Sequence, residues 1–465
     1  MQVFTRKWSE LSGVRFDVDY HCANITNLVK TYPLKSICVI KGGKRIPKGK
    51  TYATHHTIYK YLRVDDLDSN EIQIDIDSLK SIDKEIFDML KSYEIYNGEI
   101  ILSNAGTVGK TFLFYNDTEN RVILTENCVK LQVAKNIHPK FLNIVLKMDF
   151  LQQQIKQNYI QTTIPKLAIE RIKNLKIPAI PPKEIQHQII DIMDNAYLLK
   201  AQKENEAKNI LDSIDSYILD ELGIALPSKN TDLRHRIYTT KLSFISGKRF
   251  DCEYHQSYYK ELEKCLKQGK YKLASISSVI KSIKKGIEVG RNEYTKEKAI
   301  PFIRVSDISS NGINFDGVNK FITRSLYDNL KADFQPKEGE LLYSKDGTIG
   351  ICLEASCEKE YIISGAIVRI AINNTANSFF IQTLLTSSII NALANRETIG
   401  AIIKHLTIDN LLNIRIPLPS LPEQEKIANE IIKRKQKALK LQKEAKEILE
   451  SAKIKVEKII LGGER

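Results

Sequence analysis

The sequence lacks the patterns that mark several common classes of protein. Its seven cysteines are odd in number, scattered and never spaced C-x-x-C, so neither a disulfide framework nor a zinc site is indicated. Such cysteine usage fits a reducing cytoplasm. No run of about eighteen apolar residues occurs, and no basic stretch followed by an apolar run opens the chain. We therefore expect a cytoplasmic protein without a membrane span or secretion signal.

Motifs of self-contained enzymes are also missing. The eight histidines are scattered, and H-E-x-x-H does not occur. The N-P-P-[YF] motif of amino-methyltransferases is absent, since the nearest string, IPPKE, lacks the asparagine. GTVGKT (106–111) ends like a phosphate-binding loop but lacks its first glycine, and the similar GTIGIC has no lysine. We interpret both strings as turns after strands, in which glycine supplies positive φ.

The chain is instead rich in charge. Lys and Arg number 70 against 56 Asp and Glu among 465 residues, a formal net charge of +14, and 42% of the residues are hydrophobic. This composition describes a globular chain long enough for several domains. The basic balance favours a polyanionic partner such as nucleic acid. A chain can also be basic without binding anything, so the position of the charge has to decide.

An internal repeat organises the chain. VFTRKWSELSGVRFDVDYH (3–21) is echoed without a gap by IYTTKLSFISGKRFDCEYH (237–255). Further matches follow in the same order: YLRVDDL (61–67) with FIRVSDI (302–308), GEIILSNAGTVG (98–109) with GELLYSKDGTIG (339–350), VKL (129–131) with VRI (368–370), and LAIERIKNLKIPAIPPKE (167–184) with LTIDNLLNIRIPLPSLPE (406–423). A unit of roughly 235 to 240 residues is too long for a solenoid repeat. We infer two whole domains and two connectors.

Each unit changes character at a proline-rich stretch. Before it, short β-type runs such as EIILS and ELLYS alternate with glycine turns and helical segments. After it, each copy continues as uninterrupted helix. Because proline is tolerated in a first helical turn, each proline cluster is a plausible signal for the start of that helix. We predict an α+β protein with two tandem α/β domains, at 1–182 and 225–422, each followed by a long helix, at 183–224 and 423–461.

Both long helices carry a narrow apolar seam with 3-4 spacing. Its members include Ile189, Met193, Ile210 and Ile214 in the first helix and Ile427, Ile431, Leu441 and Ile448 in the second. Such a seam commonly packs a helix onto its own domain. However, residues 184–222 hold 3 basic and 9 acidic residues, whereas 423–458 hold 11 and 7. Opposite charge favours pairing of the two helices, so we predict an antiparallel intramolecular coiled coil.

The remaining positive charge is divided equally, because residues 1–183 and 223–422 each carry a net charge of +8. Much of it lies in KGGKRIPKGK (41–50) and KSIKKGIEVGR (281–291), at corresponding places. Glycine lets the backbone approach a phosphate closely, and Lys or Arg neutralises it. Candidate DNA contacts are Lys41, Lys44, Arg45, Lys48, Lys50, Lys110, Lys281, Lys284, Lys285, Arg291 and Lys345. The alternative is that these are solvated charged loops.

The motif RFD-x-[DE]-Y-H stands near the start of each copy. A catalytic Asp–His pair is conceivable there, with His21 or His255, but a duplicated framework is the favoured interpretation. We expect Arg15, Asp17, Arg249 and Asp251 to tie this segment to the domain or to a partner.

Together these motifs resemble the specificity subunit of a Type I restriction-modification enzyme. The resemblance rests on two G-[DE]-[IL]-[IL] blocks ending in G-T-[IV]-G (98–109 and 339–350), each followed by an I-P stretch before a long helix. IPLPSLPEQEKI (416–427) is the strongest match, and the tandem arrangement covers nearly the whole chain.

The resemblance implies that each domain reads one half of a split site in double-stranded DNA, while the helices act as a spacer. It implies no catalytic activity and no cofactor in this chain. The partners would be two methyltransferase subunits and two restriction subunits, which would bind S-adenosylmethionine and ATP with Mg²⁺. Divergence of the domains outside the matched blocks predicts different half-sites. The alternatives are a self-contained DNA methyltransferase or endonuclease, and an interaction scaffold that does not bind DNA.

Overall fold

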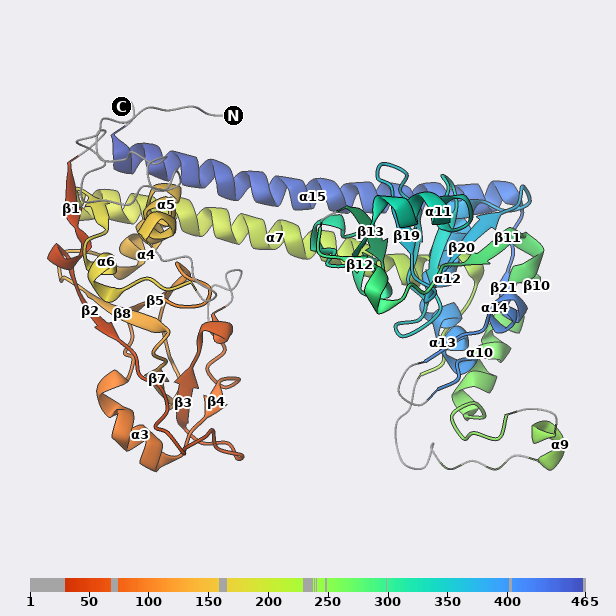
Figure 1. Ribbon diagram of the computed structural model, residues 1–465, viewed down its shortest axis with the longest axis horizontal. Coiled ribbons are helices and arrows are strands. Elements are labelled where there is room, and N and C mark those ends of the chain that lie inside the picture. Colours follow the sequence, from red (N-terminus) through yellow and green to blue (C-terminus); the bar gives the residue numbers. More distant parts are fainter. Residues whose placement is uncertain are drawn as a thin grey trace. The chain divides into compact units, whose positions relative to one another are not determined.

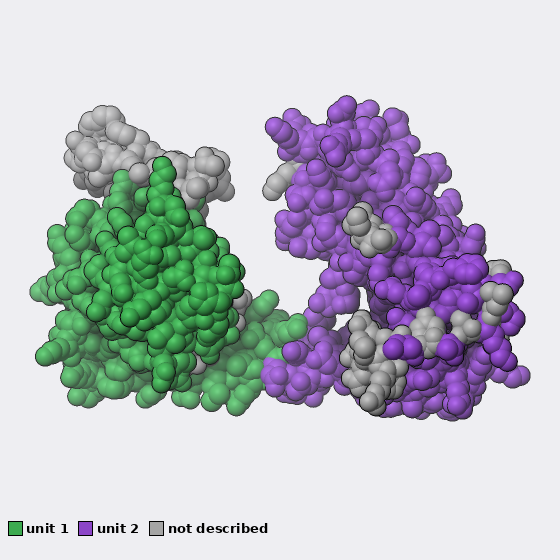
Figure 2. Space-filling model, turned by 90° about the horizontal axis from the view of Figure 1, so that it is seen from below, with its two compact units in different colours: residues 1–204, 442–465 green, residues 205–441 purple. Residues whose placement is uncertain are grey.

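The computed structural model describes residues 30–67, 74–158, 165–228, 237, 239, 241–246, 249–297, 299–400 and 404–462. The chain forms two compact units (Figure 2). The first comprises residues 1–204 and 442–465, and the second residues 205–441. Each unit therefore combines one globular domain with one half of each long helix.

The described residues of the first unit's domain form three small sheets. An antiparallel sheet has the order β2 (Cys38–Gly42), β8 (Cys128–Val133), β5 (Ile100–Ser103) and β6 (Thr111–Leu113). A second has the order β4 (Lys80–Ser81), β3 (Tyr59–Leu62) and β7 (Arg121–Leu124), in which β3 and β7 are parallel. A third pairs β1 (Thr31–Pro33) with β9 (Lys176–Pro178). The helices are α3 (Lys84–Leu90), α4 (Pro139–Lys147), α5 (Asp149–Asn158) and α6 (Ile169–Lys173).

The domain of the second unit repeats this plan. Its antiparallel sheet has the order β11 (Ile280–Lys285), β20 (Ile367–Ile372), β17 (Leu341–Ser344) and β18 (Cys352–Glu354). The other sheets are β12 (Tyr294–Thr295), β16 (Phe321–Ile322), β13 (Ile300–Ile303) and β19 (Ile362–Ile363); β10 (Leu273–Ser275) with β21 (Arg415–Pro417); and β14 (Ile308–Ser309) with β15 (Gly312–Ile313). The helices are α9 (Leu242–Ile245), α10 (Ser257–Gln268), α11 (Arg324–Phe334), α12 (Ser378–Thr386), α13 (Ser388–Arg396) and α14 (Ile408–Asn413). The shared strand order confirms the duplication.

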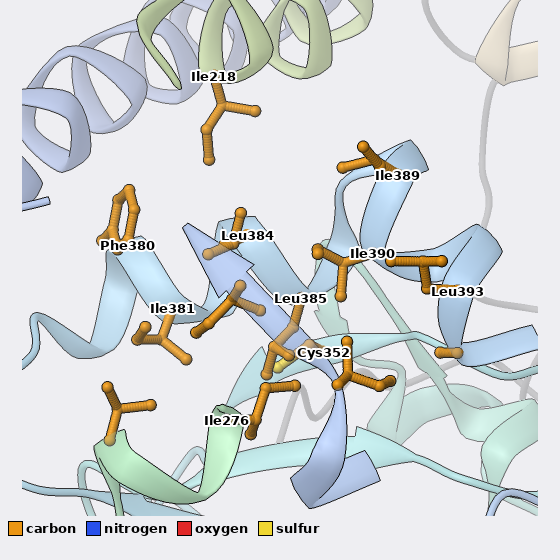
Figure 3. Packing of buried hydrophobic residues seen from close by; sticks show 14 of the residues in the cluster. Ile218, Ile276, Cys352, Phe380, Ile381, Leu384, Leu385, Ile389, Ile390 and Leu393 are labelled. Atoms are coloured by element: carbon orange, nitrogen blue, oxygen red, sulfur yellow. The ribbon is translucent and has the colours of Figure 1, made fainter. Parts of the chain in front are cut away.

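The main core of the second unit joins its sheet to its helices. Ile381 and Leu385 of α12, Ile390 of α13 and Cys352 of β18 are at most 1% exposed. Figure 3 shows that Ile218, from a long helix, faces the same cluster. Each fully buried aliphatic side chain of this kind contributes roughly 1.5–3 kcal/mol. The core therefore fastens the long helix to the domain.

The two long helices are α7 (Lys183–Leu222) and α15 (Leu421–Leu461), which lie side by side in Figure 1. In the first turn of each helix, a buried glutamine bonds to the helix's own domain. The Gln186 side chain accepts a hydrogen bond from the backbone N–H of His138 at 2.8 Å, and Gln424 accepts one from Asn377 at 2.9 Å. These matched contacts fix how each helix leaves its domain.

The helices pair in antiparallel fashion, as expected. In the first unit, Ile189 and Met193 near the start of α7 share a cluster with Ala452 and Val456 near the end of α15. In the second unit the order is reversed, because the end of α7 packs with Ile427 and Ile431 at the start of α15. The seam thus packs on both the domain and the partner helix, so the two interpretations of it are not exclusive.

Small side chains and charge both contribute to the helix pair. Ala207 and Ala438 are buried together with Leu441, while Ile210 packs against them half-buried. Lys203 pairs with Glu444 at 2.5 Å in the first unit, and Lys437 pairs with Glu206 at 3.1 Å in the second. Because exposed ion pairs contribute little, the buried alanine and isoleucine contacts dominate.

Candidate nucleic-acid interface

The basic segment of the first domain starts on a sheet edge and continues as a loop. Lys41 lies on the edge strand β2, opposite Lys130 of β8. Lys44, Arg45, Lys48 and Lys50 follow in the loop, and all five candidate side chains are exposed: Lys41, Lys44, Arg45, Lys48 and Lys50. Arg45 pairs with Glu126 at 2.5 Å and Lys50 with Glu85 at 2.8 Å. Within the described part of the chain, the other three cations have no ion pair.

The basic segment of the second domain lies largely on the matching edge strand rather than in a loop. Lys281, Lys284 and Lys285 belong to β11, and Arg291 begins a short 3-10 helix. All four side chains are exposed. Exposed lysine on an edge strand also prevents unwanted strand pairing. These residues are thus placed where they can meet DNA, but their position has a second physical explanation.

The first glycine after each edge strand is required by close packing. A Cβ atom on Gly43 would lie 2.0 Å from the carbonyl oxygen of Thr125, and one on Gly286 would lie 2.3 Å from that of Ser364. Each glycine therefore lets its chain cross the end of a neighbouring strand. This packing is a second reason for glycine at these two positions, beside the predicted close contact with phosphate, which stays a prediction.

The GTVG and GTIG strings are turns after strands, as predicted. Gly106 and Gly109 have positive φ, as do Gly347 and Gly350. The hydroxyl of the preceding serine accepts a backbone N–H across each turn, at 2.9 Å in the first copy and 2.8 Å in the second. This geometry agrees with a framework turn.

The two candidate lysines in these turns are engaged within their own domains. The Lys110 ammonium donates to the carbonyl oxygen of Leu67 at 2.6 Å. Lys345 pairs with Asp346 at 2.6 Å, and its side chain is only 11% exposed. Lys345 is therefore less accessible to DNA than the edge-strand lysines.

Sequence reasoning missed a matched arginine in each domain. Arg63 forms two hydrogen bonds to Asp66, at 2.7 and 3.2 Å, and these raise the pKa of the guanidinium. Arg304 is held in the same way by Asp307. The side chains of both arginines are 32% exposed. The matched strings YLRVDDL and FIRVSDI contain both pairs and could have identified them.

Arg63 belongs to the same surface as the basic loop. A cavity of about 420 Å³ is lined by Arg45, Lys50, Arg63 and the ring of Tyr52, together with Glu126. Guanidinium groups and an aromatic ring are the side chains that most often contact phosphates and bases. The first domain therefore gathers three cations around one hollow next to the exposed edge.

A buried ion pair beneath each basic edge was also missed. Lys130 and Glu99 lie 3.1 Å apart with side chains 4% and 6% exposed. Arg369 and Glu340 occupy the matched positions at 3.5 Å. The sequence contained the signal, since Glu99 and Glu340 follow the glycine of the GE blocks, and the cations are the central residues of VKL and VRI.

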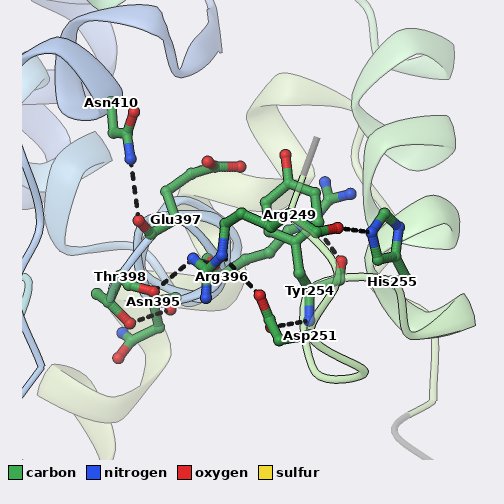
Figure 4. Close-up of polar contacts among 9 residues, drawn as sticks. All are labelled: Arg249, Asp251, Tyr254, His255, Asn395, Arg396, Glu397, Thr398 and Asn410. Carbon is green, nitrogen blue, oxygen red and sulfur yellow. Dashed lines mark hydrogen bonds and ion pairs between the residues drawn. The ribbon is translucent and has the colours of Figure 1, made fainter. Parts of the chain in front are cut away.

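The RFD motif of the second copy ties its segment to the domain, as expected (Figure 4). The Arg249 guanidinium donates to the carbonyl oxygen of Thr398 at 2.5 Å and to Asp251 at 2.7 Å. Arg396 lies 4.4 Å from the Tyr254 ring centroid. His255 bonds the backbone oxygen of Arg249, which agrees with a framework role. The first-copy residues Arg15, Asp17 and His21 lie outside the described residues.

Electrostatics reinforce this clasp. Burial alone would raise the pKa of Asp251, but the Tyr254 N–H and the Arg249 guanidinium outweigh it, so the pKa lies below its usual range. The carboxylate is therefore charged at neutral pH. No group of three potential metal ligands occurs among the described residues. Of the helices in the described ranges, none is both long and apolar enough to span a bilayer.

The comparisons with known proteins agree with this geometry. The model of the Type I restriction modification DNA specificity domain matches twice, at residues 27–209 and 269–451. The chain is 23% identical over 376 residues to the MjaVIII specificity subunit of Methanocaldococcus jannaschii, covering 79% of each protein. It is 22% identical over 215 residues to the EcoBI specificity subunit of Escherichia coli, covering 46% of this chain and 43% of that subunit.

The fold is similar to that of a chain from a solved structure of the type I R-M system. The TM-score is 0.53 with 15% sequence identity, and the alignment covers 93% of this chain and 97% of the other. Because the family model matches each copy of the repeat, and each match spans a globular domain and part of its long helix, the chain belongs to the family of Type I restriction modification DNA specificity domains.

Proposed function

We propose that this protein is the DNA-recognition subunit of a Type I restriction-modification system and that it reads a bipartite site in double-stranded DNA. The observation that carries the proposal is the duplicated basic edge. Lys41 on β2 and Lys284 on β11 are exposed on matched edge strands of two domains that share one plan. Lysine and arginine on such surfaces neutralise phosphates. Two similar domains suit two half-sites.

In this proposal the chain has no catalytic activity of its own. Catalysis belongs to partner subunits, which in this proposal are two methyltransferase subunits and two restriction subunits acting in the cytoplasm. Those partners would bind S-adenosylmethionine and ATP with Mg²⁺. The membership in a family of DNA specificity domains supports this division of labour.

The helix pair is proposed to set the distance between the half-sites. Helices of 40 and 41 residues are about 60 Å long at 1.5 Å per residue. One turn of DNA is about 34–36 Å. A rod of this length suffices to hold two domains over half-sites separated by roughly one turn.

The proposal is tested by sequencing the methylome of cells that express the chain with its methyltransferase partner. We expect one bipartite methylated motif with two unlike halves. The absence of any new methylated motif would contradict the proposal. Methylation or cleavage of DNA by the purified chain alone would instead favour a self-contained enzyme.

The basic edge is tested by charge reversal in duplex binding. Lys41, Lys44 and Lys48 are each replaced by Glu, and we expect weaker binding and a flatter dependence on salt, by about 0.9 in slope per lost phosphate contact. The matched control reverses three exposed lysines on α10: Lys260, Lys264 and Lys267. Equal effects of the two variants would show that the edge is not a specific interface. A wild-type chain whose interaction with duplex shows neither salt dependence nor a preference for a bipartite site would favour an interaction scaffold that does not recognise DNA.

A further inference from the structure

A second hollow, distinct from the basic edge, lies in the first unit between the domain and the helix pair. It has a volume of about 440 Å³ and four lysines in its lining: Lys110, Lys147, Lys200 and Lys453. The rings of Phe112 and Tyr197 contribute apolar wall. A volume of several hundred Å³ with a few converging charged groups is typical of a small-molecule site.

The charges in this hollow are not balanced by the acids around it. Lys200 pairs with Glu204 at 2.7 Å, and Lys453 pairs with Glu450 at 2.8 Å. Lys110 is held by a neutral carbonyl group rather than by an acid. Two of the four ammonium groups therefore lack a carboxylate partner among the described residues.

Lys147 is the most telling of the four. It is the last residue of α4, and its ammonium has no hydrogen bond or ion pair to the described residues. The ammonium lies over the Phe112 ring, 5.5 Å from the ring centroid. Burial lowers the pKa of this amine. A cation that is desolvated without an internal partner costs stability, so a ligand of opposite charge is the natural complement.

The second copy shows that this cluster is not part of the shared framework. Ile351 and Thr386 occupy the positions of Lys110 and Lys147 in the aligned blocks. The matched glutamine anchors of the long helices place Ala438 at the position of Lys200. Asp149 bonds to Glu457 in the first unit, and Ser388 bonds to Asp215 in the second, so Glu457 and Asp215 are equivalent. Four residues before them, Leu211 therefore occupies the position that is equivalent to Lys453.

All four lysines are thus replaced by uncharged residues in the second unit. The second copy forms an equivalent sheet and equivalent helix contacts without these lysines. The fold of the domain therefore does not require their charges. Their gathering in one copy points to a role that only the first unit performs.

We propose that this hollow binds a phosphate group, with Lys147 and Lys110 as the principal contacts and Lys200 and Lys453 at its rim. Ammonium groups are common phosphate ligands. The phosphate could be supplied by the DNA backbone or by a free phosphate compound, and Phe112 and Tyr197 offer faces for the remainder of such a molecule. The DNA source rests on the proposed function, whereas the free source does not.

The test uses the full-length chain and inorganic pyrophosphate as the probe. Thermal unfolding is measured with and without pyrophosphate at constant ionic strength, since a ligand that binds the folded state raises the midpoint. We expect stabilisation of the wild-type chain and its loss in Lys147→Met. That variant keeps most of the side-chain length, and without ligand it should be at least as stable as wild type because it removes a partly desolvated charge. Lys200→Gln, at the rim, should weaken the effect only partly.

Lys435→Met is the matched control. Lys435 lies in the second unit, is also partly buried, and its ammonium is 5.0 Å from the centroid of the Phe379 ring, but it does not line the hollow. Its replacement should leave stabilisation by pyrophosphate unchanged. An identical loss in this control would overturn the assignment.

A second arm identifies the source of the phosphate. If DNA supplies it, Lys147→Met should lower the salt slope of duplex binding by about one. Pyrophosphate binding with an unchanged slope assigns the site to a free phosphate compound. The proposal is wrong if Lys147→Met changes neither the rise of the thermal midpoint with pyrophosphate nor the salt slope of duplex binding. A chain that binds no duplex at all would refute the proposed function while leaving the pyrophosphate result to decide this site.

Discussion

Removing one partner of the buried Lys130–Glu99 ion pair should loosen the first domain beneath its basic edge. Lys130→Met leaves the Glu99 carboxylate buried at 6% exposure without its cation. Breaking a buried pair in this way typically costs about 3–5 kcal/mol. Glu99 keeps hydrogen bonds from the Tyr96 N–H at 3.0 Å and the Gln132 amide at 2.6 Å. We therefore expect a cost near the lower limit, about 3 kcal/mol.

The double variant separates the orphaned charge from lost packing. Lys130→Met with Glu99→Gln removes both charges and retains an acceptor for the Tyr96 N–H. We expect this variant to lose only about 1 kcal/mol relative to wild type, since a neutral pair of similar volume avoids the unpaired charge. The double variant should thus be more stable than the single Lys130→Met variant.

Hydrogen exchange of the full-length chain measures these costs locally. About 3 kcal/mol corresponds to roughly a hundredfold loss of amide protection in β5 and β8. The control is Lys140→Met, which breaks an ion pair to Asp194 at 2.7 Å whose side chains are 40% and 44% exposed. It should change protection by less than tenfold. Equal losses in Lys130→Met and Lys140→Met, or no recovery in the double variant, would refute the reasoning.

Three further predictions concern packing, pH and helix length. Gly286→Ala should cost about 3 kcal/mol in urea unfolding, because its Cβ would meet the Ser364 oxygen at 2.3 Å, whereas Gly49→Ala should cost about 1 kcal/mol, since nothing lies within 4 Å and only positive φ opposes it. Burial raises the pKa of the Cys38 and Cys128 thiols from 9.0 to about 12. The stability that these two protonated thiols contribute should therefore be fully present below pH 9 and should be lost as the pH rises from about 9 to 12. Replacing both cysteines with alanine and following unfolding against pH should reduce that alkaline loss; an unchanged profile would contradict it. Deleting seven residues, about 10 Å, from both α7 and α15 should shorten the methylated motif's spacer and keep its half-sites; an unchanged spacer in the methylome would exclude the spacer role.

Much of the fold could be predicted because the duplication made local patterns visible twice. The matched GE blocks marked β5 and β17, the glycine strings marked their turns, and proline marked the start of α7 and α15. Helix α7 ends at Leu222, two residues before the expected end at 224. Helix α15 begins at Leu421, two residues before the expected start at 423. Periodicity and proline chemistry act over a few residues, so they can be read without the tertiary structure.

The candidate interface was less accessible to sequence reasoning. Lys41 and Lys345 looked alike as basic residues near glycine, yet one is exposed on an edge strand and the other is buried beside Asp346. The requirement for glycine at position 43 comes from the backbone of Leu124 and Thr125, which lies where a Cβ atom would be. Exposure and close packing depend on segments far apart in the chain, which a local pattern does not contain.

The sequence by itself determined the two-domain plan, the long helices and the division of positive charge, because repetition, periodicity and charge are properties of the chain alone. Only the tertiary structure decided which cations remain in water, which are neutralised by buried acids, and that Lys147 lies in a hollow with three other lysines. The physical reason is desolvation: the behaviour of a charged side chain is fixed by the partners and water around it, and folding brings those partners from distant parts of the sequence.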